Sequence, residues 1–476
     1  MHFVHKKKQW KKFSEVLALQ FLLPNKKYLT LFLLSSACGY QAEEGELFPG
    51  GDTTNTFLLG PNAFILPAEN ILEEHEPSFY TGNSFFNQAW VEAPASTQKR
   101  DGLGPFFNAR SCASCHFKDG RGAPPEEGEK FLSLLLKVGI DGADEYGKPN
   151  PSPTFGGQIQ TFSILAINDE AEADVSYTQI TGEYGDGTTY SLLKPTYSIK
   201  QNDVVVSSLY VSPRIAPAVI GMGLLESIPL ERLEELADPN DQDGDGISGK
   251  INWVWSDSTQ SLDVGRFGWK AESNNVEQQV SAAFIHDMGI TNPVFPENTC
   301  ATEQISCQEQ PSGGEPEIEQ LLFDKVVLYT SLLAVPMRRN MEDPHVIRGK
   351  RLFREIGCDQ CHTPTHMTGT ETTFSELSEQ KIWPYTDLLL HDMGEGLEDG
   401  LRGFEATGTE WRTPPLWGIG LVEKVNRHTR FLHDGRARNL AEAILWHGGE
   451  AENSKELFQE LDLEDREALL SFVRSL

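Results

Sequence analysis

Basic residues and cysteines are both scarce in this chain of 476 residues. Its 40 lysines and arginines stand against 70 aspartates and glutamates, which gives a formal charge of −30. An excess of acid argues against nucleic acid as a partner, because binding to phosphates needs a basic surface. The seven cysteines are too few for a disulfide scaffold of this length, and an odd number leaves at least one unpaired. Apolar residues make up 39% of the chain, enough to exclude disorder as its main state.

Long apolar runs are also lacking near the N-terminus. Residues 28–34 form an apolar run that is too short to cross a bilayer of about 30 Å. The run follows a lysine-rich stretch and precedes Ser35, Ser36 and Ala37, so residues 1–37 are predicted to be a signal peptide. Cys38 then resembles the acylated cysteine of a bacterial lipoprotein, which predicts a periplasmic protein with a lipid anchor as its membrane contact. Ordinary export, with Cys38 as an incidental thiol, is the alternative.

Four of the cysteines belong to two Cys-x-x-Cys-His motifs. The first is Cys112, Cys115 and His116, and the second is Cys358, Cys361 and His362. This spacing is typical of c-type haem attachment, in which two thiols bind the porphyrin edge and the histidine binds the iron. A zinc site would need further ligands near each pair, and a redox dithiol does not need the histidine. Two covalently bound haem c groups are therefore predicted.

The pattern of the chain predicts a mainly α fold. Residues 38–70 are expected to be a tether, 71–340 an N-terminal haem domain, and 341–476 a C-terminal haem domain. A glycine precedes two apolar residues at +3 and +4 in both 82–86 and 349–353, which is a weak internal repeat. Helices are expected over residues 230–236, 276–284, 317–333 and 464–476. Residues 131–213 contain strand patterns and read as a β insertion in the first domain.

Two smaller features are expected to be structural. Asp241, Asp243 and Asp245 alternate along an acidic loop and match the first ligand positions of a calcium loop, so Ca²⁺ binding is predicted. A solvated acidic turn is the alternative. Cys300 and Cys307 are close in sequence and are expected to form a local disulfide.

Several segments around the haem motifs carry a resemblance to a known family. They are residues 100–111, 119–122, 265–271, 390–394, 411–418 and 431–437. Together they resemble the di-haem oxidoreductase family, also labelled thiol oxidoreductase, over nearly all of the chain from about residue 79. The family is similar in plan to bacterial di-haem cytochrome c peroxidases and MauG-like enzymes. The resemblance implies two cytochrome-c-like domains with one haem each.

The resemblance also implies a sixth iron ligand for the C-terminal haem. His447 stands where the related peroxidases carry methionine, so His362 and His447 are expected to bind this iron from opposite sides. The rival ligands are Met393, His391 and Met367. We expect His391 and His433 to orient a loop or a haem propionate, and His366 to be exposed.

At the N-terminal haem, His116 is the expected iron ligand, and no catalytic group matches the family pattern. His286 is the distal candidate, with His75 as a second, and Trp269 is either an electron relay or core. The leading hypothesis is a peroxidase that receives electrons from a redox partner protein through the C-terminal haem and reduces peroxide at the N-terminal haem. The alternatives are an electron-transfer cytochrome without peroxidase activity, and a MauG-like oxidase of a protein or metal substrate.

Overall fold

The structure is a computed structural model that describes residues 43–476, so the expected signal peptide and Cys38 lie outside the described residues. The α-helices are α1 (Glu76–Asn87), α2 (Cys112–Cys115), α3 (Met222–Glu226), α4 (Leu230–Leu236), α5 (Val276–Asp287), α6 (Ile305–Gln308), α7 (Gln320–Ser331), α8 (Pro344–Glu355), α9 (Val422–Asn426), α10 (Leu440–Leu445), α11 (Glu452–Glu460) and α12 (Leu463–Ser475). The strands are β1 (Phe106–Phe107), β2 (Leu134–Ala143), β3 (Pro149–Asn150), β4 (Gln158–Ile159), β5 (Phe162–Ser163), β6 (Glu172–Glu183), β7 (Thr189–Gln201), β8 (Val204–Val205), β9 (Tyr210–Ile215), β10 (Trp253–Ser256), β11 (Ser261–Val264), β12 (His366–Met367), β13 (Lys381–Ile382), β14 (Leu390–Asp392) and β15 (Glu410–Arg412).

The expectation of a mainly α fold is wrong. Helices account for 27% of the residues and strands for 19%, and the strands form several separate sheets. Part of the difference lies in the C-terminal half, where β12 pairs with β13 and β14 pairs with β15. The larger part lies in the β insertion, whose strands β2 to β9 run from Leu134 to Ile215 and include the long strands β6 and β7.

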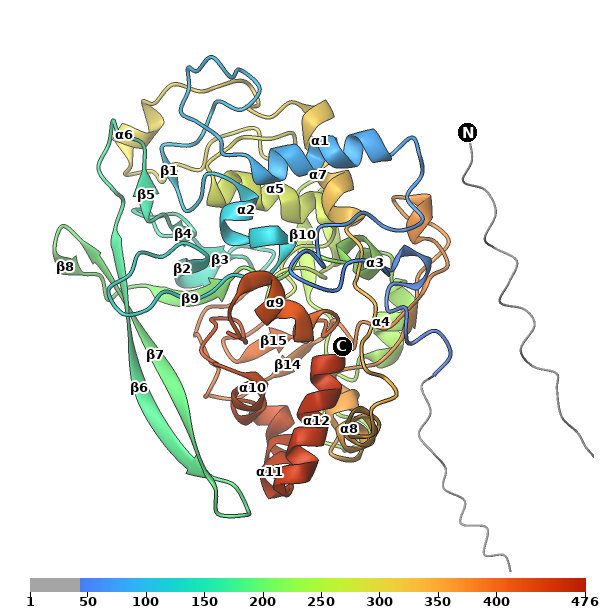
Figure 1. The fold of residues 1–476 in the computed structure, drawn as a ribbon. Helices are drawn as coiled ribbons and strands as arrows, with labels where there is room; N and C mark the ends of the chain where they lie inside the picture. The colour runs from blue at the N-terminus through green and yellow to red at the C-terminus, as the bar shows by residue number, and fades with distance from the viewer. Residues whose placement is uncertain (1–42) are drawn as a thin grey trace, which may run out of the picture. The chain divides into compact units, whose positions relative to one another are not determined.

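Two helix pairs of the same construction organise the two halves of the chain. Helix α1 packs against α7, and α8 packs against α12 (Figure 1). At each crossing a glycine lets the two backbones touch: a Cβ on Gly82 would overlap the carbonyl oxygen of Lys325, and one on Gly349 would overlap that of Ala468. The weak repeat in the sequence therefore corresponds to a repeated helix crossing.

The β insertion consists of a sheet and a long hairpin. In the sheet, β2 pairs antiparallel with β4, β9 and β3. In the hairpin, β6 pairs with β7 along their whole length, and Figure 1 shows it extending toward α11. At the tip, the Gly185 amide donates to the Gln459 carbonyl at 2.9 Å, and Arg466 forms an ion pair with Asp186 at 2.6 Å. The insertion of the first half is thus attached to the last helices of the chain.

The described part of the expected tether, residues 43–70, is packed against the rest of the fold. Glu46 is fully buried, forms ion pairs with Arg338 and Lys350, and accepts a hydrogen bond from the Tyr385 hydroxyl at 2.7 Å. Burial alone would raise the pKa of Glu46, but the two cations outweigh it and hold the pKa below its ordinary value. A charged anchor of this kind is not apparent from a polar, acidic sequence.

Each helix pair contributes its buried side chains to a separate apolar core. Cys112 packs against a cluster that contains Phe86 and Tyr329, and Cys358 packs against a second cluster that contains Phe353 and Phe472. Within residues 43–476, none of the helices has the length and apolar character needed to cross a membrane.

The glycine crossings predict a specific loss of stability. Gly349→Ala should lower the free energy of unfolding by about 2–3 kcal/mol, because the added methyl group must separate α8 from α12 despite alanine's better helix propensity. Gly157→Ala is the control, since a Cβ there meets nothing within 4 Å. Urea denaturation of both variants measures the difference, and equal midpoints would show that the helices do not touch at Gly349.

Candidate functional site

The first Cys-x-x-Cys-His motif lies on the short helix α2 and the residue that follows it. Burial raises the pKa of the Cys112 thiol to about 12 and also raises that of Cys115, so both thiols are neutral at pH 7. The Nδ1 atom of His116 lies 2.7 Å from the carbonyl oxygen of Pro217, and burial lowers the pKa of its imidazole. A carbonyl only accepts, so Nδ1 carries the proton and Nε2 keeps a free lone pair. This is the tautomer that a histidine needs to bind iron through Nε2.

The second motif repeats this arrangement at a 3-10 turn, Cys358–Gln360. Burial raises the pKa of Cys358 to about 12, and His362 Nδ1 lies 3.1 Å from the Tyr385 carbonyl oxygen. The ring of His362 is 6.1 Å from that of Phe353, and the ring of His116 is 6.2 Å from that of Phe86, with nearly equal interplanar angles of 51° and 50°. In both motifs, the phenylalanine four positions after the glycine of the internal repeat lies against the histidine.

Neutral thiols distinguish between the possible uses of these cysteines. A zinc site or a reactive dithiol works through thiolates, which a nearby cation or a helix N-terminus must stabilise. Here burial acts in the opposite direction at all four cysteines, raising the pKa of each thiol. At Cys361 the charged ring of His391, with Nδ1 3.7 Å from Sγ, acts to lower the pKa, but burial outweighs it.

A single cavity of about 460 Å³ joins the two motifs. Its lining includes both cysteines and the histidine of each motif, together with many apolar side chains of the two cores. The two motifs thus share one interior space.

His447 lines this cavity as the sequence predicts for a ligand. It follows α10, its Nδ1 lies 2.7 Å from the Ala443 carbonyl oxygen, and its pKa is lowered by burial. Burial lowers the pKa of His362 to about 4, and the second cause is the nearby charge of His447. The two imidazoles are thus close, neutral and each provided with a free Nε2, so the predicted pair has the chemistry of an axial ligand pair.

The rival ligands fit less well. Both ring nitrogens of His391 face carboxylates, with Nε2 at 2.8 Å from Asp387 and Nδ1 at 2.7 Å from Glu450. Burial would lower the pKa of His391, but these carboxylates raise it well above its ordinary value, so it is an imidazolium without a lone pair. Met367 is 52% exposed and does not line the cavity, whereas Met393 does.

Of two other histidines, His366 differs from its expected surroundings, whereas His433 holds its loop against β9. His366 is buried, not exposed, and its Nε2 lies 2.7 Å from the Thr386 carbonyl oxygen. His433 stacks on Trp411 at 3.8 Å and directs Nδ1 to the Pro213 carbonyl oxygen at 3.0 Å. Burial lowers the pKa of His433 to about 4, and its Nε2 is buried without a hydrogen-bond partner within the described residues.

Helix α5 brings an acid to the side of the cavity that holds the first motif. His286 lines the cavity, and burial lowers its pKa to about 3. The next residue, Asp287, also lines the cavity and raises the pKa of Cys112 and Cys115 by its charge. Burial raises the pKa of Asp287 to about 6, and Gln158 donates to its carboxylate at 2.9 Å.

Asp287 is the residue that the sequence reasoning missed. Its one signal is its position next to His286, since burial beside the first motif cannot be read from the sequence. The second distal candidate, His75, does not line the cavity and pairs with Glu376 at 2.7 Å.

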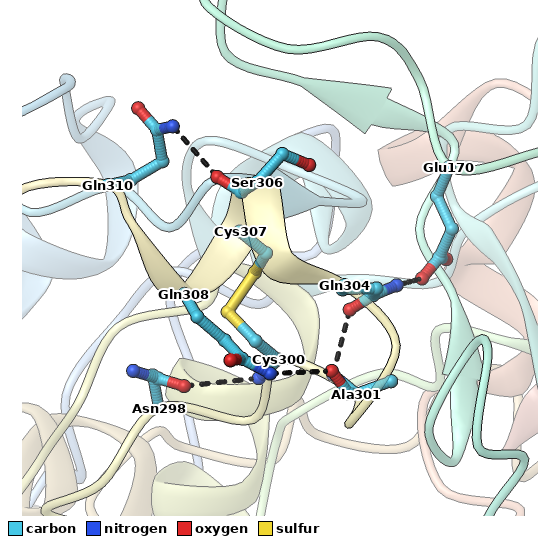
Figure 2. The surroundings of a disulfide bond; sticks show 9 residues. All are labelled: Glu170, Asn298, Cys300, Ala301, Gln304, Ser306, Cys307, Gln308 and Gln310. Atoms are coloured by element: carbon cyan, nitrogen blue, oxygen red, sulfur yellow. Dashed lines mark hydrogen bonds between the residues drawn. A yellow bond between two sulfur atoms is a disulfide. The ribbon is translucent and has the colours of Figure 1, made fainter.

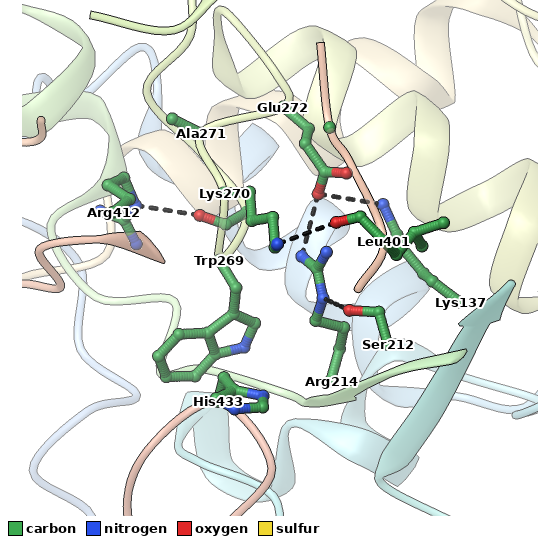
Figure 3. A network of polar contacts seen from close by, with 12 residues as sticks. Lys137, Ser212, Arg214, Trp269, Lys270, Ala271, Glu272, Leu401, Arg412 and His433 are labelled. Atoms are coloured by element: carbon green, nitrogen blue, oxygen red, sulfur yellow. Dashed lines mark hydrogen bonds and ion pairs between the residues drawn. The ribbon is translucent and has the colours of Figure 1, made fainter. Parts of the chain in front are cut away.

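A buried polar network lies between the two halves (Figure 3). Lys270 is fully buried and forms an ion pair with Asp399 at 2.9 Å. The Trp269 indole lines the cavity and donates to the Ile215 carbonyl at 2.8 Å. This placement is compatible with both readings of Trp269, relay and core, and does not separate them.

The acidic loop lies beside the second motif. The carboxylate oxygens of Asp241, Asp243 and Asp245 lie within 4.8 Å of one another, and Asp245 accepts a hydrogen bond from Gln360 at 2.9 Å. Exposed acidic groups often gather without a cation. Calcium binding stays a prediction.

The remaining two cysteines of the described residues, Cys300 and Cys307, form a disulfide (Figure 2). Gln304, between them, donates to the buried Glu170, whose pKa is raised by burial to about 8. The disulfide loop is thereby attached to the β insertion, away from the cavity lining.

Comparisons with known proteins assign the chain to a family. The family model described as "Di-haem oxidoreductase, putative peroxidase" matches residues 46–476, so the chain belongs to this family. No curated protein matches the chain significantly. Among solved structures, hydrazine synthase of Kuenenia stuttgartiensis, pressurised with xenon, aligns over 89% of this chain and 98% of its own, with 13% identity and a TM-score of 0.31.

The residues around the cavity fit the haem groups of the family. Each motif supplies two neutral thiols and a histidine with a free Nε2, in a lining that is mostly apolar. His447 supplies a second such histidine whose charge acts on His362, whereas the charge of His286, which lines the cavity beside the first motif, is not among the causes of the lowered pKa of His116.

Replacing His447 tests its role as a ligand. His447→Ala should change the low-spin electron paramagnetic resonance signal of one haem and leave the other unchanged, because only one iron loses a ligand. His345→Ala, an exposed histidine on α8, is the control. A spectrum of His447→Ala identical to the control would remove His447 as a ligand.

Proposed function

We propose that this di-haem oxidoreductase is an exported peroxidase with two covalently attached haem c groups. Cys112, Cys115 and His116 hold the haem at which peroxide is reduced. The C-terminal haem, held by Cys358 and Cys361 with His362 and His447 as axial ligands, receives electrons from a donor protein. The overall reaction is H₂O₂ + 2 e⁻ + 2 H⁺ → 2 H₂O.

The difference between the two motifs supports this assignment of roles. His362 lies in the field of a second histidine, whereas the lowered pKa of His116 comes from burial, with no side-chain charge among its causes. Beside the first motif stands Asp287, a carboxylate whose pKa lies near neutrality. The histidine acting on His362 favours two ligands and electron transfer at the second motif, and Asp287 favours proton transfer at the first.

Asp287 supplies the acid–base chemistry in this proposal. The haem iron, when bound, supplies the redox centre for cleavage of the O–O bond. The ionised carboxylate of Asp287 accepts a proton from one peroxide oxygen and returns it to the departing oxygen, as general acid–base catalysis requires. The amide of Gln158 orients the carboxylate, and the apolar wall keeps bulk water from competing for the proton.

Ligand binding to the reduced protein separates peroxidase from electron carrier. We expect one of the two haems to bind carbon monoxide after reduction, because His116 alone would hold its iron. Optical and electron paramagnetic resonance spectra measure this directly. Two low-spin haems, neither of which binds carbon monoxide, would overturn the peroxidase proposal and favour an electron-transfer cytochrome.

Asp287→Asn should lower kcat for peroxide reduction by a factor of about 10²–10⁴. In the wild type, activity should fall as the pH falls through about 6, because protonation removes the base, and the variant should lack this dependence. Asp257→Asn is a matched control, since Asp257 also accepts a glutamine amide, from Gln278 at 2.7 Å, but does not line the cavity. Equal kcat values in the two variants would exclude Asp287 as the acid–base group.

A further inference from the structure

Three arginines from separate segments line the cavity between the two motifs. Arg121 follows the first motif, Arg214 lies on β9, and Arg412 lies on β15. Arg214 and Arg412 are 5% and 7% exposed. Two of these residues belong to the first half of the chain and one to the second.

Two of these guanidinium groups have no carboxylate partner among residues 43–476. Arg121 donates to the carbonyl oxygens of Arg430 and Leu432, and Arg412 donates to that of Gly268 at 2.9 Å. The Nη1 atom of Arg412 is buried and has no hydrogen-bond partner in the described part of the chain. Burial lowers the pKa of Arg121 and of Arg412 to about 10, so both remain charged at pH 7.

The third arginine is only partly compensated. Arg214 forms an ion pair with Glu272 at 3.0 Å, but Glu272 also pairs with Lys137 at 3.3 Å (Figure 3). Burial would raise the pKa of Glu272, but these cations lower it to about 2, so one negative charge faces two positive ones. The Nη2 atom of Arg214 is also buried without a partner within the described residues.

Two other buried cations of this region are matched by carboxylates. Lys270 pairs with Asp399 and donates to several backbone carbonyls, and Arg436 pairs with Asp434 at 2.8 Å. Among the residues that line the cavity, the unmatched positive charge lies at Arg121, Arg214 and Arg412. Taking an ion out of water costs several kcal/mol, and buried charges in proteins are normally paired.

We infer that Arg121, Arg214 and Arg412 bind the propionate carboxylates of the two haems. Each haem brings two carboxylates, and guanidinium groups bind carboxylates through paired N–H donors. The unpartnered Nη atoms of Arg214 and Arg412 supply such donors inside the cavity. The inference rests on the bound haems of the proposed function but not on peroxide reduction. A protein whose haems bind no carbon monoxide could therefore still bind its haem propionates through these arginines.

The midpoint potentials of the haems test this role. Arg412→Gln and Arg121→Gln should each shift the equilibrium of at least one haem about tenfold toward the ferric form, because the positive charge that favours the ferrous iron is lost. For one electron a tenfold change corresponds to 59 mV. Arg412→Lys keeps the charge and should restore most of the potential.

Arg474→Gln is the control, because Arg474 is 52% exposed, pairs with Glu467 and does not line the cavity. If both cavity variants give potentials equal to this control, the inference is overturned. If the glutamine variants lose their haem while Arg412→Lys keeps it, the inference is supported. If Arg412→Gln, Arg121→Gln and Arg412→Lys all lose haem, a crystal structure of the wild-type holoprotein is the deciding measurement. A haem carboxylate within hydrogen-bond distance of Arg121, Arg214 or Arg412 would support the inference, and the absence of such a contact would overturn it.

Discussion

The close approach of two helix backbones at a glycine is the contact on which the arrangement of this protein depends. It occurs at Gly82 and again at Gly349, and in each case the aromatic residue four positions later lies against the histidine of a Cys-x-x-Cys-His motif. A larger side chain at either glycine would move the helix that carries this aromatic residue. The geometry of both motifs is therefore fixed by packing, and the differences between them come from the residues on the opposite wall.

Those differences separate the two motifs chemically. Backbone carbonyls fix the tautomers of His116, His362 and His447 in the same way, so the histidines themselves do not distinguish the sites. What distinguishes them is a second imidazole at one motif and the carboxylate of Asp287 at the other. One repeated scaffold can thus hold two redox centres with different ligand fields and different access to protons.

The sequence predicted the parts of this site that are local. Motif spacing placed both cysteine pairs, and helical periodicity placed α4, α5, α7 and α12 to within a few residues. It failed where long-range contacts decide. Strand β6 is largely exposed, β7 is largely half-buried, and neither has a clear apolar alternation. The buried Glu46 lies in a stretch whose sequence is that of a polar linker. Asp287 and the cavity arginines were missed for the same reason, since their importance comes from burial without a matching charge.

The hairpin of β6 and β7 has a consequence for the order in which the protein can be completed. Its tip is held by Gln459 and Arg466, and the Arg466–Asp186 pair spans 280 residues of chain. Because synthesis proceeds from the N-terminus, the hairpin emerges long before its partners exist. The hairpin tip therefore has no docking partner until the final helices of the chain, α11 and α12, have been made.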